Sequence, residues 1–339
     1  MGSLPLWWFF YHLPSALDLP GLTVPILNAG VDLFFVISGF VMVHSTRNRQ
    51  HAPRTFLIQR FTRIVPFYWA MTFLMIAALW IFVGRPSTPE QIVKSLLFIP
   101  YLDTATGYVQ PILGVGWTLN LEIIFYGLFA LTMALGTLWQ MVAIGVVFAI
   151  AVIARIAVEP AADTVLFFYT TPILFEFLAG MVVGHLTGHL ARCPLPLAVS
   201  MIAFAIVSAL VMRFSLDLPR SVSQGIPAIL LVAACIRLET AFRAYTPRML
   251  ARLGDASYSL YLTHTIVLLV ATPAIANLDL SPWIAGGITV MACVIVAMAS
   301  YRLVEIPLLN LSRTHILTQR LAMSPKRAIP FLAPNSPWQ

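Results

Sequence analysis

The sequence predicts an all-α, polytopic integral membrane helix bundle with about ten transmembrane helices. Of its 339 residues, 60% are hydrophobic and only 10% are charged, whereas about a quarter of the residues in an ordinary soluble domain are charged. Apolar runs of about 20 residues, the length that crosses a bilayer as a helix, recur along most of the chain. Lys and Arg residues also gather in every second connection between these runs, as expected for cytoplasmic loops.

The first predicted helix is short. Residues 4–13 offer about ten apolar residues, which make roughly 15 Å of helix and cover half of a bilayer. We therefore expect this helix to be truncated, with the true start upstream of Met1 or the chain a fragment. Nine longer segments are each expected to span the membrane. They are residues 27–45, 64–83, 117–135, 139–157, 166–187, 196–212, 222–237, 257–276 and 283–303.

The basic residues orient the bundle. With the N terminus inside, 15 of the 20 Lys and Arg residues fall in cytoplasmic segments and 5 on the other side, a bias that predicts both termini in the cytoplasm. The five on the outer side are Arg85, Lys94, Arg155, Arg213 and Arg220. This topology explains the net charge of +7, and no basic stripe with interleaved aromatic residues indicates a nucleic-acid partner.

The domain organisation follows from the apolar runs. Residues 1–311 are expected to form one transmembrane domain. Residues 312–339 hold four prolines and lose the apolar runs, so we expect a disordered cytoplasmic tail. The three cysteines are scattered and form neither a CxxC pair nor a disulfide framework.

Ionisable residues inside apolar segments are the candidates for function, because a charge in the bilayer interior costs about 2.5–3.5 kcal/mol on insertion scales. The alternative for each is a polar clamp between helices, which contributes on the order of 0.6 kcal/mol. Five positions qualify. They are His12, Asp32, Glu122, Glu176 and His264.

His12 and Asp32 form the first candidate constellation. Their helices are expected to run antiparallel, so the two side chains can meet if the helices are neighbours. A carboxylate that holds one imidazole nitrogen leaves the other free to accept a proton. This arrangement predicts a general base that deprotonates a hydroxyl for attack on an acyl carbon. The sequence has no GxSxG motif of a serine hydrolase and no metal-ligand cluster, so no metal site is predicted.

Arg60 and Arg63 form the second constellation. They are three residues apart and share one helix face, and two guanidinium groups suit a phosphate better than lysines do. The alternative is a helix end anchored at anionic lipid headgroups. Tyr68 and Trp69 follow, and they are expected either to lie in the interfacial belt or to line a slot for a nucleotide base.

In two further segments, polar residues are spaced so that they lie on one face of a helix. Thr118 and Glu122 are four residues apart and suit a sugar hydroxyl or amide, with a hydrogen bond that ties helices together as the alternative. Ser257, Tyr261 and His264 also share a face, but capping of the helix by Asp255 or Ser257 accounts for most of this pattern.

Seven motifs occur in a characteristic order along the chain. They are YHL at 11–13, GVDLFFVISGFVM at 30–42, RxxRIxPxYW at 60–69, GWTLNLEIIFY at 116–126, FEFLAGMVVG at 175–184, LGDASYSLYLTH at 253–264 and VEIPL at 304–308. Together they resemble the membrane-bound acyltransferase 3 family, in the branch that O-acetylates exopolysaccharide and lipopolysaccharide sugars. The resemblance covers residues 11 to about 310.

The resemblance implies ten membrane helices in a bacterial inner membrane and an O-acyltransferase. It implies acyl-CoA, most often acetyl-CoA, as the donor substrate, with no permanently bound cofactor. The implied acceptor is a hydroxyl of an exported or lipid-linked carbohydrate. Membrane lipids and polysaccharide-assembly proteins are the other partners expected.

The family pattern also implies residue roles. His12 resembles the essential histidine and Asp32 the acid of the GVDxFFxxSG motif. Glu122 matches the acid of the WSLxxE-like motif, and Thr118 stands where serine is common. Arg60 and Arg63 resemble the pair associated with the donor. One departure is that the basic residue usual eleven positions before the histidine is replaced by Met1.

A path through the bundle links these roles. About 12 residues, or roughly 18 Å, separate Asp32 from the cytoplasmic end of its helix, so the pantetheine arm of a donor held at Arg60 and Arg63 is expected to thread up to His12. A transporter or flippase of a lipid-linked glycan is the alternative, since intramembrane acids suit it too. An inactive family member that organises a polysaccharide-assembly complex is the third hypothesis.

Overall fold

The computed structural model describes residues 25–47, 52–215, 219–242, 248–276, 278 and 280–311. Nearly all regular structure in these residues is helical, which confirms the all-α prediction. The elements are, in chain order, α2 (Pro25–Thr46), α3 (Pro53–Ala78), η1 (Leu79–Val83), α4 (Pro89–Leu96), β1 (Leu102–Asp103), β2 (Tyr108–Val109), η2 (Gly114–Gly116), α5 (Trp117–Thr132), η3 (Met133–Leu135), α6 (Thr137–Val158), α7 (Val165–Tyr169), α8 (Leu174–His185), α9 (Thr187–Leu190), α10 (Leu195–Ser215), η4 (Ser221–Gly225), α11 (Ile226–Phe242), α12 (Arg248–Asp255), α13 (Ser257–Ala276), α14 (Pro282–Ser300) and η6 (Tyr301–Glu305).

The predicted membrane segments are confirmed where the structure describes them. Seven helical stretches are long and apolar enough to cross a membrane, and two shorter apolar helices, at 30–46 and 195–208, accompany them. All nine long segments expected from the sequence therefore contain a helix. The short first segment, 4–13, and the tail, 312–339, lie outside the described residues.

The helix expected at 64–83 begins eleven residues earlier, at Pro53. Proline is favoured in the first turn of a helix, where its missing N–H is not needed. The early turns are also held by packing, because the Phe56 ring stacks on Phe129 of α5 at 5.1 Å between centroids. Both Arg60 and Arg63 consequently lie within α3 and not in a preceding loop.

The segment expected at 166–187 is two helices, α7 and α8. Pro172 lies in the break, and proline cannot continue the backbone hydrogen bonds of a preceding helix. The connection between α3 and α5 is also structured, by α4 and the two-stranded β1–β2 hairpin. Thr88 and Gln91 form a capping box that starts α4, a feature that apolar periodicity does not reveal.

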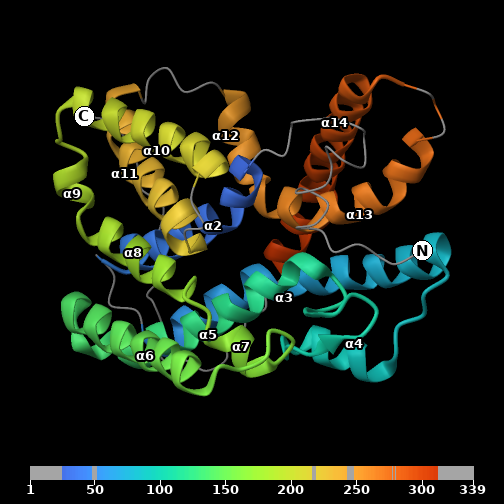
Figure 1. Ribbon diagram of the computed structural model, residues 1–339, viewed down its shortest axis with the longest axis horizontal. Helices are drawn as coiled ribbons and strands as arrows, with labels where there is room; N and C mark the ends of the chain where they lie inside the picture. Colours follow the sequence, from blue (N-terminus) through green and yellow to red (C-terminus); the bar gives the residue numbers. More distant parts are fainter. Residues whose placement is uncertain are drawn as a thin grey trace, which may run out of the picture.

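Two helix pairs flank the middle of the bundle, where α10 and α11 pack against α2, and α13, which pairs with α14, packs against α3. In Figure 1, α10 and α11 lie together on one side of the molecule, while α13 and α14 pair on the other. The largest buried cluster joins α2, α3, α5, α8 and α13. Its aromatic members include Phe35, which packs edge-on against Phe177 at 4.6 Å and against Trp117 at 6.0 Å between centroids.

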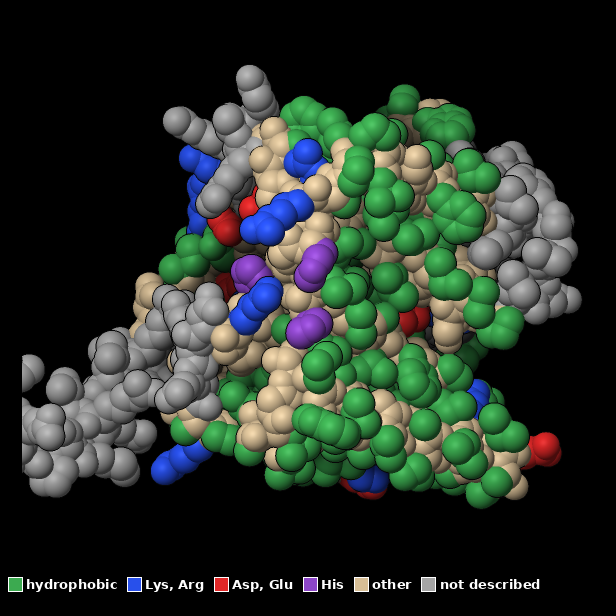
Figure 2. Space-filling view, turned by 90° about the vertical axis from the view of Figure 1, so that its left-hand side faces the viewer, with side chains coloured by type: hydrophobic (Ala, Val, Ile, Leu, Met, Phe, Trp, Pro, Cys, Tyr) green, Lys and Arg blue, Asp and Glu red, His purple; other side chains and the backbone are tan. Residues whose placement is uncertain are grey.

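Apolar side chains cover much of the outer surface, as expected for helices that face lipid. On the face seen in Figure 2, hydrophobic side chains dominate, and Lys, Arg and His side chains gather in one region of it. In α6, Trp139 is 70% exposed and Ile156 is 69% exposed, a pattern that would be unfavourable in water but suits a hydrocarbon environment.

Two glycines permit the closest helix contact in the described bundle, between α2 and α8. A Cβ added at Gly39 would overlap the carbonyl oxygen of Phe177, and one added at Gly180 would overlap that of Val36. Small residues at such crossings let the backbones of membrane helices approach. The crossing lies about one to two turns along α2 from Asp32, which belongs to the candidate site.

We expect Gly39→Ala to destabilise the folded protein by about 1–3 kcal/mol, the usual effect of overpacking a core. Thermal unfolding of the protein in detergent measures this loss of stability, after gel filtration has shown that the protein elutes as a monodisperse species. Gly127→Ala is the matched control, because a Cβ there meets nothing within 4 Å and alanine favours the helix by about 1 kcal/mol over glycine. Equal stability of the two variants would show that the α2–α8 contact is not tight.

Candidate active site

Asp32 of α2 is fully buried and forms an ion pair with Arg220, the residue before η4. The Nη2 of Arg220 donates to Oδ2 of Asp32 at 2.9 Å, and its Nε donates to Oδ1 at 3.4 Å. The Arg220 side chain remains 42% exposed. One guanidinium group therefore covers both oxygens of a carboxylate that has no contact with solvent.

Arg220 was not among the site residues predicted from the sequence. A signal existed, because Arg220 was expected on the outer side and Asp32 near the outer end of its helix, so their opposite charges lie at similar depth. The two residues are 188 positions apart, and the sequence offers no rule that pairs them over this separation.

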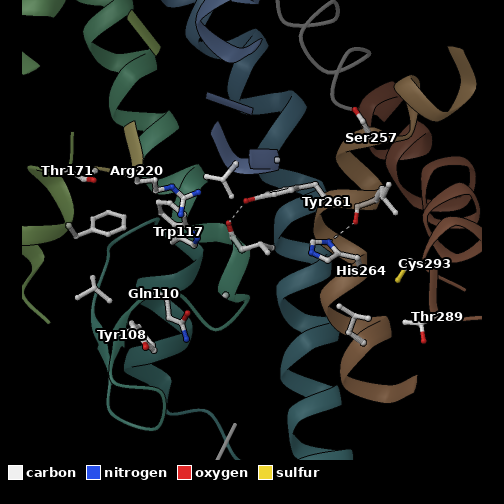
Figure 3. A pocket seen from close by; sticks show the side chains of 18 of the residues that line it. Tyr108, Gln110, Trp117, Thr171, Arg220, Ser257, Tyr261, His264, Thr289 and Cys293 are labelled. Carbon is white, nitrogen blue, oxygen red and sulfur yellow. Dashed lines mark hydrogen bonds between the residues drawn. The ribbon is translucent and has the colours of Figure 1, made fainter. Parts of the chain in front are cut away.

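A cavity of about 730 Å³ opens beside this ion pair. Its walls are mostly apolar, and the polar lining includes Arg220, Gln110 and Tyr108 near one end and His264 and Thr289 near the other (Figure 3). The remaining lining residues are Gly30, Val31, Val109, Gly114, Val115, Trp117, Ala162, Phe167, Phe168, Thr171, Ser257, Leu260, Tyr261, Leu268, Val290, Cys293 and Val294.

Tyr261 lies between the two ends of the cavity (Figure 3). Its hydroxyl donates to the carbonyl of Val115 at 2.9 Å and hydrogen-bonds with the Thr118 hydroxyl at 2.7 Å. Ser257, Tyr261 and His264 all line the cavity, which confirms that these residues of α13 share one face. The β1–β2 hairpin, which contributes Tyr108, was not predicted as part of a site.

Thr118 stands one layer behind the cavity wall. It is fully buried, is not among the residues that line the cavity, and bonds to Tyr261, which does line it. Contact between Thr118 and an acceptor stays a prediction, and the structure places Tyr261 closer to the open space.

Glu122 is buried between α2 and α5. It accepts hydrogen bonds from the Ser38 hydroxyl at 2.7 Å and from the Tyr126 hydroxyl at 2.5 Å. The charges of Arg60 and Arg63 act on it as well. Glu122 does not line the cavity, so the structure connects this acid with the arginine pair of α3, and its catalytic role stays a prediction.

Arg60 points toward the C-terminal end of α2. Its Nη2 donates to the Ser45 hydroxyl at 2.7 Å, and its guanidinium lies 5.4 Å from the centre of the Phe56 ring. The Nε of Arg60 is buried and has no hydrogen-bond partner among the described residues. Arg63, one turn further along the helix, is exposed. The pair therefore offers donor groups to an anion.

Tyr68 and Trp69 bond to the connection between α3 and α5. Tyr68 is fully buried and donates to the carbonyl of Ser95 at 3.1 Å, while the indole of Trp69 donates to that of Leu96 at 2.9 Å. The Tyr68 ring stacks on Phe98 at 4.7 Å. These contacts tie α4 to α3, and they do not bring either side chain to Arg60. Donor binding by the two aromatic residues stays a prediction.

His12 lies outside the described residues, so its predicted contact with Asp32 stays a prediction. Along α2, Asp32 and Ser45 are 13 residues apart, or ~20 Å. The Asp32–Arg220 pair and the Arg60 side chain thus lie at two depths of one bundle. The distance between these two levels is close to the roughly 18 Å expected from the sequence.

Glu176, in the first turn of α8, lies beside Asp32 and Arg220. The sequence singled it out as an intramembrane acid but assigned no role to it. Among the described residues, no group of three or more His, Cys, Asp or Glu side chains is placed to hold a metal ion.

An apolar helix bundle of this kind, with seven stretches long enough to cross a bilayer, defines a polytopic integral membrane protein. Residues 3–302 match the acyltransferase domain that defines the acyltransferase 3 family, and the chain belongs to that family.

The chain is also similar to a bacterial protein. It is 35% identical over 305 residues to the exopolysaccharide production protein ExoZ of Rhizobium meliloti strain 1021, an alignment that covers 87% of this chain and 93% of the relative. No solved structure matches the chain significantly.

Proposed function

We propose that this membrane acyltransferase moves an acetyl group from acetyl-CoA to a hydroxyl of a cell-surface or lipid-linked carbohydrate. The observation that carries the proposal is the cavity whose lining includes Arg220, the ion-pair partner of the buried Asp32. Membership of the acyltransferase 3 family supports acyl transfer over a glycan transporter without acyl chemistry. The similarity to an exopolysaccharide production protein supports a carbohydrate acceptor.

The lining of the cavity supports an acceptor that carries an apolar chain. Arg220, Gln110 and Tyr108 offer hydrogen bonds at one end, where a sugar would find partners. At the other end, Leu268, Val290 and their apolar neighbours on α13 and α14 offer no hydrogen bonds. The two polar side chains there, His264 and Thr289, each hydrogen-bond to a backbone carbonyl of their own helix. Buried polar groups need hydrogen-bond partners, so a bare oligosaccharide would fit the second region poorly and a lipid carrier would fit it well.

The donor is proposed to bind at the other level of the bundle. The phosphate groups of acetyl-CoA would pair with Arg60 and Arg63, because planar guanidinium groups bind phosphate oxygens in pairs. The unpartnered Nε of Arg60 supports an anionic ligand there. The uncharged pantetheine arm would then bridge the ~20 Å to Asp32.

The chemistry requires one proton transfer and one exchange of bonds. The acceptor hydroxyl gives its proton to His12, held by Asp32, and the hydroxyl oxygen forms a bond to the acetyl carbon. The carbon–sulfur bond of the thioester breaks, and the CoA sulfur takes up the proton. His12 acts either as the base or as a nucleophile that first carries the acyl group. A test for an acyl-enzyme in the absence of acceptor distinguishes these two roles.

The orientation of the protein is proposed from its charges. The Lys and Arg bias supports an orientation with both termini on the cytoplasmic side of a bacterial inner membrane. In this orientation the Arg60 level would face the cytoplasmic acetyl-CoA pool and the Arg220 level would face outward. Polysaccharide-assembly proteins are the proposed partners at the outer side, where the acetylated product leaves.

Asp32→Asn tests this function. We expect it to lower acetylation of surface polysaccharide at least about 100-fold, which is the lower end of the contribution typical of a general base. The protein level should stay normal because the amide keeps the shape of the carboxyl. Proton NMR of isolated polysaccharide measures the acetyl content.

Asp103→Asn is the matched control. It makes the same substitution in another aspartate that pairs with an arginine, Arg85, on the β hairpin. A folded Asp32→Asn protein with full acetylation would contradict the proposed role of the carboxylate.

A further inference from the structure

Glu176 is a buried acid for which the proposed mechanism has no use. It is 3% exposed, and neither of its carboxyl oxygens has a hydrogen-bond partner of normal geometry among the described residues. Its charged neighbours there are Asp32 from α2 and Arg220 from the start of η4. A carboxyl group left in this state inside a membrane protein is costly and calls for an explanation.

The backbone of η4 closes over this carboxyl. A Cβ added at Gly225 would lie 2.9 Å from Oε1 of Glu176, so the glycine permits the close approach of the two elements. The adjacent Gln224 also has a buried side-chain oxygen without a partner among the described residues. The described surroundings are therefore rich in acceptor oxygens, and the cation that they contain is Arg220.

The charges do not balance if both acids are ionised. Among the described residues, Asp32 and Glu176 would carry two negative charges against the one positive charge of Arg220, and an uncompensated charge buried in a bundle costs several kcal/mol. The guanidinium group bonds both oxygens of Asp32, which identifies Asp32 as the ionised member. One bound proton on the other acid restores neutrality.

We propose that Glu176 is a neutral carboxylic acid whose hydroxyl donates a hydrogen bond to Asp32, which makes it a positioning residue of the active site. The proton supplies the hydrogen bond that the carboxyl otherwise lacks. Asp32 is then held from two sides, by Arg220 and by Glu176, with one orientation toward the reacting groups. The role in catalysis rests on the proposed acyl transfer, whereas the protonation state does not.

Two substitutions separate the hydrogen bond from the charge. Glu176→Gln keeps a neutral donor of the same shape, and we expect most of the turnover at neutral pH to be retained. Glu176→Leu keeps neutrality and bulk but removes the donor. We expect it to lower kcat by 10-fold to about 100-fold, since small misplacement of a reacting group costs about this much, with an unchanged KM for acetyl-CoA.

The pH profile gives a readout that packing alone would not move. Wild-type activity should fall at high pH as Glu176 loses its proton, and Glu176→Gln should lack this loss because an amide does not titrate. In the part of the chain that the structure describes, the titratable side chains beside Glu176 are Asp32 on α2 and Arg220, the residue before η4, and neither changes in the variant.

Infrared difference spectroscopy tests the protonation state without any activity. Purified wild-type protein should show the carbonyl stretch of a buried protonated carboxylic acid, and Glu176→Gln should lose it. Absence of that band in the wild type would overturn the proposal, as would loss of activity in Glu176→Gln together with a requirement for Na⁺, which would indicate a bound cation. Presence of the band in a protein without acyl transfer would uphold the proton and refute the proposed function alone.

Discussion

Arg220→Met is expected to destabilise the folded protein far more than Asp32→Asn does. The arginine variant leaves a fully buried carboxylate without its cation, whereas the aspartate variant leaves an arginine that is 42% exposed and can be solvated. Breaking a buried ion pair costs about 3–5 kcal/mol, and we expect the lower part of this range because water reaches Arg220. Thermal unfolding and protein yield in detergent measure the difference.

The double variant completes the test. Asp32→Asn combined with Arg220→Met removes both charges, so the stability should return to near that of Asp32→Asn while acetylation stays absent. This non-additive result is expected for two residues in direct contact. If the effects of the two substitutions simply add, the ion pair does not exist in the folded protein.

Arg60→Leu is expected to raise the KM for acetyl-CoA by about 10-fold to 100-fold with a smaller change in kcat. A hydrogen bond to a charged group contributes about 1.5–3 kcal/mol, and each 1.4 kcal/mol corresponds to a tenfold change in affinity. Because Arg60 lies ~20 Å along the bundle from Asp32, its contact with the donor should persist unchanged in the transition state and act on binding alone. Initial-rate kinetics with varied acetyl-CoA measure this.

The controls for Arg60 come from the same helix. Arg54→Leu removes an exposed arginine near the start of α3 and should leave the KM unchanged, while Arg60→Lys should recover only part of the affinity because an ammonium group lacks the planar fork. A loss of kcat at constant KM in Arg60→Leu would place this residue at the chemical step instead of the donor site.

Apolar length predicted most of the fold, because a bilayer imposes one requirement on every spanning segment. The failures have local causes. Pro172 splits one predicted segment into α7 and α8, and α4 with its hairpin lies in a connection where apolar periodicity carries no signal. The close crossing of α2 and α8 depends on Gly39 and Gly180, and glycines in an apolar run do not reveal which helix they will meet.

The site was predictable in its individual residues and not in their pairing. Asp32 and Glu176 were recognisable as intramembrane acids. Arg220, which pairs with Asp32 and lies near Glu176, is in a short stretch between helices, and from the sequence it counted only as part of the charge bias that sets the topology. Tyr261 was recognisable on a helix face with Ser257, whereas the cavity that both line depends on how α13 packs against η2 and α14. Such contacts are set by tertiary packing, which a single sequence does not specify.

The most direct test is a reconstituted reaction that follows both substrates. Purified protein in liposomes would receive acetyl-CoA and a lipid-linked oligosaccharide, with free CoA thiol measured by colour reaction and acetyl esters on the acceptor by mass spectrometry. We predict one ester formed for each thiol released, only with acceptor present, and neither product with Asp32→Asn. Movement of the oligosaccharide across the bilayer without thiol release or ester formation would contradict acyl transfer and identify a transporter.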